Sequence, residues 1–152
     1  MKKFTTIIAI TLLAALLFTG CDIIPMRKDF SQYGFTLSIA GEVTDEGANL
    51  LGQITLNTKY GDMTFSKMSL DLGLTEGNIA KECESKDSVD NGTIYYLAAE
   101  EDRDGNMIVK THYFTKDADG TTWLVSFVIP EDDYNKFMIT NVYKSIEFVT
   151  AE

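Results

Sequence analysis

The chain has 152 residues with 23 acidic and 13 basic side chains, so its formal charge is −10 at pH 7. Proteins that bind nucleic acid owe much of their affinity to basic groups that neutralise phosphates, so this composition argues against a nucleic-acid partner. The acidity also argues against electrostatic docking onto anionic lipid, and it is typical of a domain kept soluble by its charge.

The N-terminal residues follow the order of an export signal. Lys2 and Lys3 precede an apolar run over 4–18, which ends at Thr19, Gly20 and Cys21. A membrane-spanning helix needs about 20 predominantly apolar residues, and this run is shorter than that. We therefore predict that residues 1–20 are a signal peptide that is removed.

Residues 17–21, Leu-Phe-Thr-Gly-Cys, resemble the lipobox of bacterial lipoprotein precursors, with Phe18 at a position where leucine is usual. The resemblance implies that Cys21 receives a lipid that anchors the chain at the extracytoplasmic face of the cell membrane. Each buried methylene contributes about 0.8 kcal/mol, so two or more acyl chains make a lasting tether. Asp22 resembles the signal that retains lipoproteins in the inner membrane of Gram-negative bacteria. The alternative is ordinary secretion after cleavage near Thr19.

The mature chain has the size of one domain. Removal of residues 1–20 leaves 132 residues with 11 basic and 23 acidic side chains, a formal charge of −12. A chain of this length can bury a core that folds unaided. We predict a lipid-anchored linker over 21–32, followed by a single globular domain over 33–152.

The first half of the domain predicts a strand, a loop and a hairpin. Apolar residues alternate with polar ones over 35–39, which is typical of a strand with one covered face, and 42–49 reads as a polar loop. A hairpin follows over 54–65, with its turn at Gly61-Asp62. The apolar positions then change from odd to even numbers, which predicts a bulge or break near Ser66-Lys67.

A short helix is predicted after this hairpin. Thr75 is a suitable N-cap, and the helix would run to about Lys86 with Ile79, Ala80 and Cys83 facing inward. With Cys21 lipidated, Cys83 is the one remaining thiol and cannot form a disulfide within the monomer. We interpret it as a buried structural thiol.

The second half predicts an antiparallel meander. Three strands over 93–99, 107–115 and 122–129 are connected by Asp-Gly turns at 104–105 and 119–120, a strong signal for tight connections. Apolar residues occupy both faces of these strands, so a layer is expected on each side of the sheet.

A helix and a short strand are expected to end the domain. Pro130 ends the last strand of the meander, and Glu131, Asp132 and Asp133 suit the N-terminal end of a helix. The helix would bury one apolar stripe. A final strand is expected at 146–148. The stripe consists of Tyr134, Phe137, Met138 and Val142.

Three phrases, at 33–37 (Tyr-Gly-Phe-Thr-Leu), 92–96 (Gly-Thr-Ile-Tyr-Tyr) and 143–148 (Tyr-Lys-Ser-Ile-Glu-Phe), resemble the PsbP-like family, which includes a lumenal subunit of photosystem II and many bacterial lipoproteins. The resemblance implies an α+β fold: an antiparallel β-sheet of about six or seven strands flanked by helices, as an α/β/α sandwich. It also implies protein binding without catalysis. The chain departs from the family after Ile39, where Ala40-Gly41-Glu42 replaces a proline followed by an aromatic residue.

The sequence offers few candidates for chemistry, and we predict no catalytic residue, cofactor or metal. His112 lies within a strand and is interpreted as a half-exposed strand histidine, because no ligand or nucleophile partner is indicated. The acidic residues over 100–106 could suggest calcium, as could Asp117 and Asp119. Asp and Gly are also what hairpin turns require, and we favour that interpretation.

The leading functional hypothesis is a lipid-anchored, non-catalytic module that binds an envelope protein, with the membrane as a second partner through Cys21. The alternative is a lipoprotein that binds a small apolar ligand between sheet and helices, and a hydrolase is the third possibility. A large apolar cavity would favour the ligand, whereas an exposed aromatic patch would favour a protein. The candidate surface residues are Tyr96, Trp123, Phe127 and Phe137.

Overall fold

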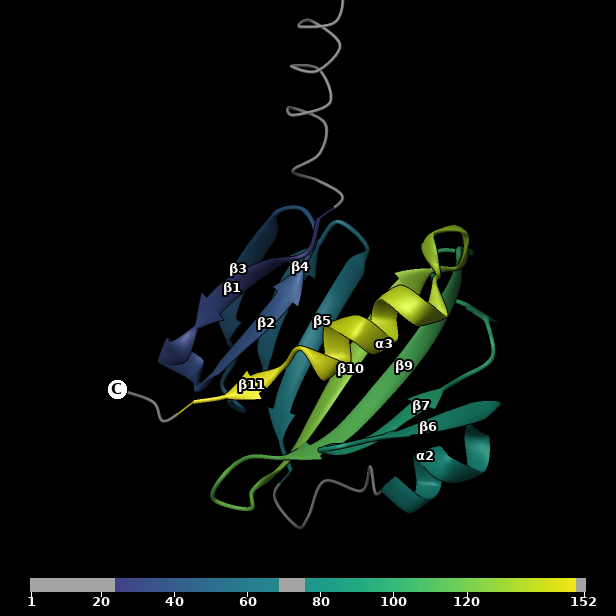
Figure 1. The fold of residues 1–152 in the computed structure, drawn as a ribbon. Coiled ribbons are helices and arrows are strands. Elements are labelled where there is room, and N and C mark those ends of the chain that lie inside the picture. Colours follow the sequence, from purple (N-terminus) through teal and green to yellow (C-terminus); the bar gives the residue numbers. More distant parts are fainter. Residues whose placement is uncertain (1–23, 69–75, 150–152) are drawn as a thin grey trace, which may run out of the picture.

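A computed structural model describes residues 24–68 and 76–149 (Figure 1), and this part of the chain folds into two antiparallel sheets with two α-helices. The α+β class predicted from the sequence is confirmed. The larger sheet has the strand order β3-β4-β5-β10-β9-β7-β6, with β8 also paired to β9, and the smaller has the order β1-β2-β11. The bounds are β1 Met26–Phe30, β2 Phe35–Ile39, β3 Val43–Ala48, β4 Ile54–Thr58, β5 Gly61–Lys67, β6 Ser85–Val89, β7 Gly92–Tyr96, β8 Glu100–Glu101, β9 Met107–Lys116, β10 Thr122–Pro130, β11 Glu147–Phe148, α2 Glu76–Glu82 and α3 Lys136–Lys144, with 3₁₀ turns η2 Ser31–Tyr33 and η3 Glu131–Asp133.

The predicted meander is confirmed as β7, β9 and β10. In the β9–β10 turn, Asp117 Oδ1 accepts hydrogen bonds from the backbone N–H groups of Asp119 at 3.0 Å and Thr121 at 2.9 Å. Gly120 has a φ of 81°, a conformation that costs glycine little. The Asp-Gly pair therefore closes the turn for backbone reasons.

One face of the larger sheet is covered by α3 and the smaller sheet, which lie next to each other across it in Figure 1. The two sheets interlock through Phe35 of β2 and Phe65 of β5, whose rings stack with centroids 4.0 Å apart. Helix α3 begins after Asn135, whose side chain caps the Met138 N–H at 3.0 Å. Tyr143 of α3 is fully buried. This face holds the main hydrophobic core.

The opposite face of the larger sheet carries a smaller apolar cluster. Ile79 of α2 packs there with Tyr95, Phe114 and Leu124 from three adjacent strands. This face therefore also carries buried apolar side chains, and α2, which contributes Ile79, has seven residues. Within 24–68 and 76–149, no helix is long and apolar enough to cross a bilayer.

Four short strands, β1, β3, β6 and β8, were not predicted, and β8 lies within the acidic residues over 100–106. β1 lies inside the predicted 21–32 linker, so that linker is wrong over residues 26–30, which pair with β2. β3 replaces the predicted polar loop over 42–49, and β6 begins at Ser85, so the predicted helix ends at Glu82 and not at Lys86. β1, β3 and β6 are edge strands, where charged side chains are favoured because they discourage pairing with other chains. The described part of the chain consequently has more strands than six or seven.

The apolar shift near Ser66-Lys67 marks the end of β5 and requires no bulge. β5 stays in continuous register with β10 from Asp62 to Lys67, and Met68 then packs against the α2-side cluster. At Met68, the change of parity thus reflects a change from one covered face to the other, and the later apolar positions lie outside the described residues. The predicted cap at Thr75 lies outside the described residues.

The apolar stripe predicted for the last helix is partly wrong. Residues Glu131–Asp133 form η3, and α3 buries Ile139, Val142 and Tyr143. Phe137 is 77% exposed because it points away from this buried stripe. The final short strand is confirmed as β11, which pairs with β2.

Candidate functional site

Three of the four predicted surface aromatics lie in the core. Tyr96 and Trp123 are 2% exposed and Phe127 is fully buried, so these three cannot form a partner surface. Their polar atoms are satisfied internally: the Tyr96 hydroxyl shares a 2.7 Å hydrogen bond with Thr140 Oγ1, and Trp123 Nε1 donates to Asp117 at 3.0 Å. Phe137 alone lies at the surface.

His112 is half-buried on the α2 side of the larger sheet, in line with the prediction. It pairs with Ser126 on the adjacent strand, and its Nδ1 lies 2.8 Å from Ser126 Oγ. Burial, and then the positive charge of Lys110, lower the pKa of His112 to about 4. The ring is therefore neutral at pH 7, and the hydrogen bond ties together two central strands.

The acidic turn residues serve the backbone. Asp102 Oδ1 accepts hydrogen bonds from the N–H groups of Asp104 and Asn106, each at 2.9 Å, and these bonds hold the pKa of Asp102 below its usual range. In the part of the chain that the structure describes, no three His, Cys, Asp or Glu side chains come together as a metal site. Cys83 is half-buried beside the α2 cluster, and it is thus less covered than predicted.

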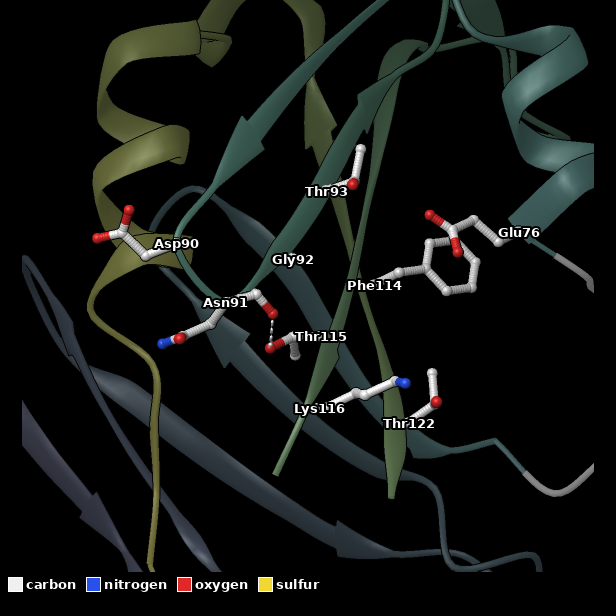
Figure 2. Close-up of a pocket in the computed structure, with 9 residues that line it drawn as sticks. All are labelled: Glu76, Asp90, Asn91, Gly92, Thr93, Phe114, Thr115, Lys116 and Thr122. Carbon is white, nitrogen blue, oxygen red and sulfur yellow. Dashed lines mark hydrogen bonds between the residues drawn. The ribbon is translucent and has the colours of Figure 1, made fainter. Parts of the chain in front are cut away.

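A polar groove of about 380 Å³ opens between the start of α2 and the strands beneath it (Figure 2). We call it the distal groove. In Figure 2, Glu76 of α2 and Phe114 of β9 lie on one side of the groove, and Asp90 and Asn91 of the β6–β7 turn lie on the other. The lining residues are Glu76, Asp90, Asn91, Gly92, Thr93, Phe114, Thr115, Lys116 and Thr122.

The distal groove depends on close packing of β7 against β9. A Cβ atom on Gly92 would lie 1.9 Å from the Phe114 carbonyl oxygen, so only glycine permits this approach. Thr115 Oγ1 donates to the Asn91 carbonyl oxygen at 2.8 Å and fixes the neighbouring turn. Most of the remaining lining groups are carboxylate, hydroxyl or amine groups, which suit a polar ligand.

Glu76 is held in place by the sheet. The Tyr95 hydroxyl donates to Glu76 Oε1 at 2.7 Å. Burial, and then this hydrogen bond to a carboxylate, raise the pKa of Tyr95 to about 12. The tyrosine thus stays protonated and keeps the carboxylate of Glu76 at the groove.

A second, apolar groove of about 210 Å³ lies between the first turn of α3, the end of β2 and the β4–β5 turn. We call it the proximal groove, because the first described residues lie beside it. Phe137, which lines the groove, is exposed, and so are Ile24 (62%) and Met26 (52%), the chain neighbours of the lining residue Pro25. The lining residues are Pro25, Ser38, Ala40, Tyr60, Phe137, Met138, Asn141 and Val142.

The two grooves lie at opposite ends of the larger sheet. Thr122, at the start of β10, lines the distal groove, whereas Val128 pairs with Asp62, beside the turn that contains Tyr60. Strands rise by about 3.3 Å per residue, so the six positions from Thr122 to Val128 separate the two ends by about 20 Å.

Sequence reasoning missed both grooves except for Phe137. No local spacing connects Glu76 with Lys116, because the register of β7, β9 and β10 brings them together. Ala40 and Tyr60 carry no motif either. The adjacent turn at Gly61, which was predicted, is the one sequence signal that points to this end of the sheet.

Comparison with known proteins gives a match at the level of the fold. No family model matches the chain, and no curated protein matches it in sequence. A crystal structure of a protein from Bacteroides thetaiotaomicron VPI-5482 is similar, with a TM-score of 0.53 and 12% sequence identity over 82% of this chain. The similarity covers 48% of that protein, so this chain spans about half its length.

Proposed function

We propose that the chain is a lipoprotein held at the extracytoplasmic face of a membrane through Cys21, and that its domain is a non-catalytic module that binds another envelope protein. The lipobox-like residues 17–21 support the tether, and Asp22 favours the inner membrane in a Gram-negative cell. β1 is compatible with it, because this first described strand begins at Met26, five positions after Cys21.

The proposed binding site is the distal groove. The observation that carries this assignment is its position at the end of the sheet about 20 Å from the proximal groove, where the tether joins the domain. A site at that end faces away from the bilayer. Its hydroxyl groups, with Glu76 and Lys116 of opposite charge, suit an extended polar segment of a protein. Phe114 supplies an apolar floor.

The shape of the protein favours this function over the binding of a small apolar ligand. Tyr96 and Phe127, which lie between the sheet and α3 where such a cavity would have to open, are packed into the core. The proximal groove, at about 210 Å³, is smaller than the roughly 300–1,000 Å³ of usual ligand sites. A protein partner therefore remains the better-supported proposal.

We also propose that the fold is PsbP-like, with the larger sheet between helices as an α/β/α sandwich. Support comes from α3 on one face and α2 on the other. A crystal structure whose strand order differed from that of the family would contradict this relationship.

Substitution of Cys21→Ala tests the tether. Membrane fractions should lose the variant, and the N-terminal peptide of the wild-type protein should begin at Cys21 and carry the mass of attached acyl chains. Unchanged fractionation together with an unmodified peptide would rule out the lipoprotein assignment.

Crosslinking in the native host, followed by mass spectrometry, tests the binding site. Lys116→Glu should reduce capture of the partner because it removes the positive charge from the distal groove. Lys81→Glu, an equal charge change at an exposed position of α2, is the matched control. Equal capture by both variants would contradict the site, and a bound metabolite with no protein partner would contradict the function.

A further inference from the structure

We propose that the apolar surface around the proximal groove rests against the lipid bilayer, so that the domain docks on the membrane with a defined orientation. This inference rests on the proposed lipidation of Cys21. The docking surface consists of Tyr60 and Phe137, which line the groove, and of Ile24 and Met26, the exposed chain neighbours of the lining residue Pro25.

The surface exposes large apolar side chains to water, and this exposure does not stabilise the domain by itself. Phe137 is 77% exposed, although it lies on a helix whose other large apolar residues are buried or, in the case of Met138, half-buried. Ile24 and Met26 add two exposed apolar side chains from a separate part of the chain. Apolar side chains that converge from distant segments mark an interaction surface more often than single exposed residues do.

The tether places this surface at the bilayer. Pro25 lines the proximal groove and is four positions after Cys21. Four residues span at most about 14 Å when fully extended, so acyl chains on Cys21 would keep the groove within that distance of the lipid. Apolar side chains of proteins that lie on a membrane reach about 5–10 Å into the boundary between headgroups and acyl chains. The groove is therefore within reach of lipid without any rearrangement of the domain.

A cation lies at the rim of the same surface. Lys59 Nζ is 5.5 Å from the centroid of the Tyr60 ring, in the β4–β5 turn. Aromatic rings flanked by lysine are favoured at membrane interfaces, where the ring meets the acyl boundary and the amine meets lipid phosphate. This arrangement favours a phospholipid surface over an apolar segment of another protein.

A second pair of exposed apolar side chains serves as a control for the effect of exposure alone on contact with lipid. Leu50 and Leu51, in the β3–β4 turn, are 105% and 87% exposed. Their turn lies at the other end of the sheet, because Ile54 pairs with Phe65 near the end of β5, whereas Tyr60 precedes the beginning of β5. If exposed apolar side chains met lipid regardless of place, both ends would contact it. Docking through the proximal groove predicts contact only at the end that carries Phe137.

The test uses the full chain in host membranes with a photoreactive residue, benzoylphenylalanine, at position 137 or at position 51. After irradiation, mass spectrometry should find phospholipid adducts at least five-fold more often at position 137. Equal yields, or adducts at position 137 that are mainly with protein or with the chain's own acylated Cys21, would overturn the docking surface. The N-terminal peptide is read in the same sample. An unmodified Cys21 would refute the lipoprotein assignment, whereas a lipidated Cys21 with no enrichment at position 137 would refute the docking alone.

Discussion

The half-buried His112 should make the protein less stable in weak acid, and a substitution of this histidine should remove that loss. His112 has a pKa of about 4 in the folded protein, against its ordinary value of 6.5, because burial disfavours the charged ring. Between these values the unfolded chain binds a proton that the folded protein does not. The free energy of unfolding is therefore fully retained above pH 6.5 and falls as the pH drops toward 4.

The size of this loss follows from the same two values. Each unit of pKa difference is worth about 1.4 kcal/mol, so the contribution lost between pH 7.5 and pH 5 is about 2 kcal/mol. Urea denaturation at both pH values measures it, with His112→Gln beside the wild-type domain. The variant should lose about 2 kcal/mol less than the wild type over this interval.

Ser126→Ala is the matched control. It removes the hydrogen bond to His112 Nδ1 but keeps the ring and its burial, so the pH dependence should persist. If wild type and His112→Gln lost stability equally between the two pH values, the neutral, half-buried histidine would not be the cause and the reasoning would be refuted.

Three further substitutions test the core, the distal groove and a turn by urea denaturation. Tyr143→Phe should cost about 2 kcal/mol, because it leaves a buried threonine hydroxyl without its partner; a cost under 0.5 kcal/mol would contradict this. Gly92→Ala should cost about 3 kcal/mol or more, since its Cβ would meet the Phe114 carbonyl oxygen, and an unchanged midpoint would disprove that close approach. Asp117→Ala should cost about 1–2 kcal/mol through lost turn hydrogen bonds, whereas exposed Asp119→Ala should cost under about 0.5 kcal/mol; equal costs would show that the turn does not depend on Asp117.

The strands that could be predicted are those whose own residues show the apolar pattern and the turn residues typical of a strand. β9 and β10 have nine or more residues, are apolar on both faces and meet at an Asp-Gly turn, so local signals agree. β1, with the sequence Met-Arg-Lys-Asp-Phe, and β6, with Ser-Lys-Asp-Ser-Val, have no such pattern. These edge strands form because a neighbouring strand offers hydrogen bonds to their backbone. Their own residues do not indicate that such a neighbour is present.

The candidate sites were harder to predict than the fold. The aromatic residues singled out from the sequence are mostly core, because large aromatic side chains stabilise a protein best when buried. Phe137 was predicted to face inward. It points outward because the buried stripe of α3 runs through Ile139, Val142 and Tyr143. In a short helix, a shift of the buried stripe by one residue is enough to move a side chain from the core to the surface.

The smaller sheet can be completed only late in synthesis, because it pairs strands from the two ends of the domain. β2 is paired on one side with β1 and on the other with β11, and Ser145 Oγ accepts a hydrogen bond from the Ser38 N–H, 107 positions away. Such distant pairings are slow to form, because the loop between them must close first. A ribosome must have added Phe148 before β11 can take its place. The smaller sheet is thus complete only after residues 147–148 have been synthesised, which is compatible with the export that we propose.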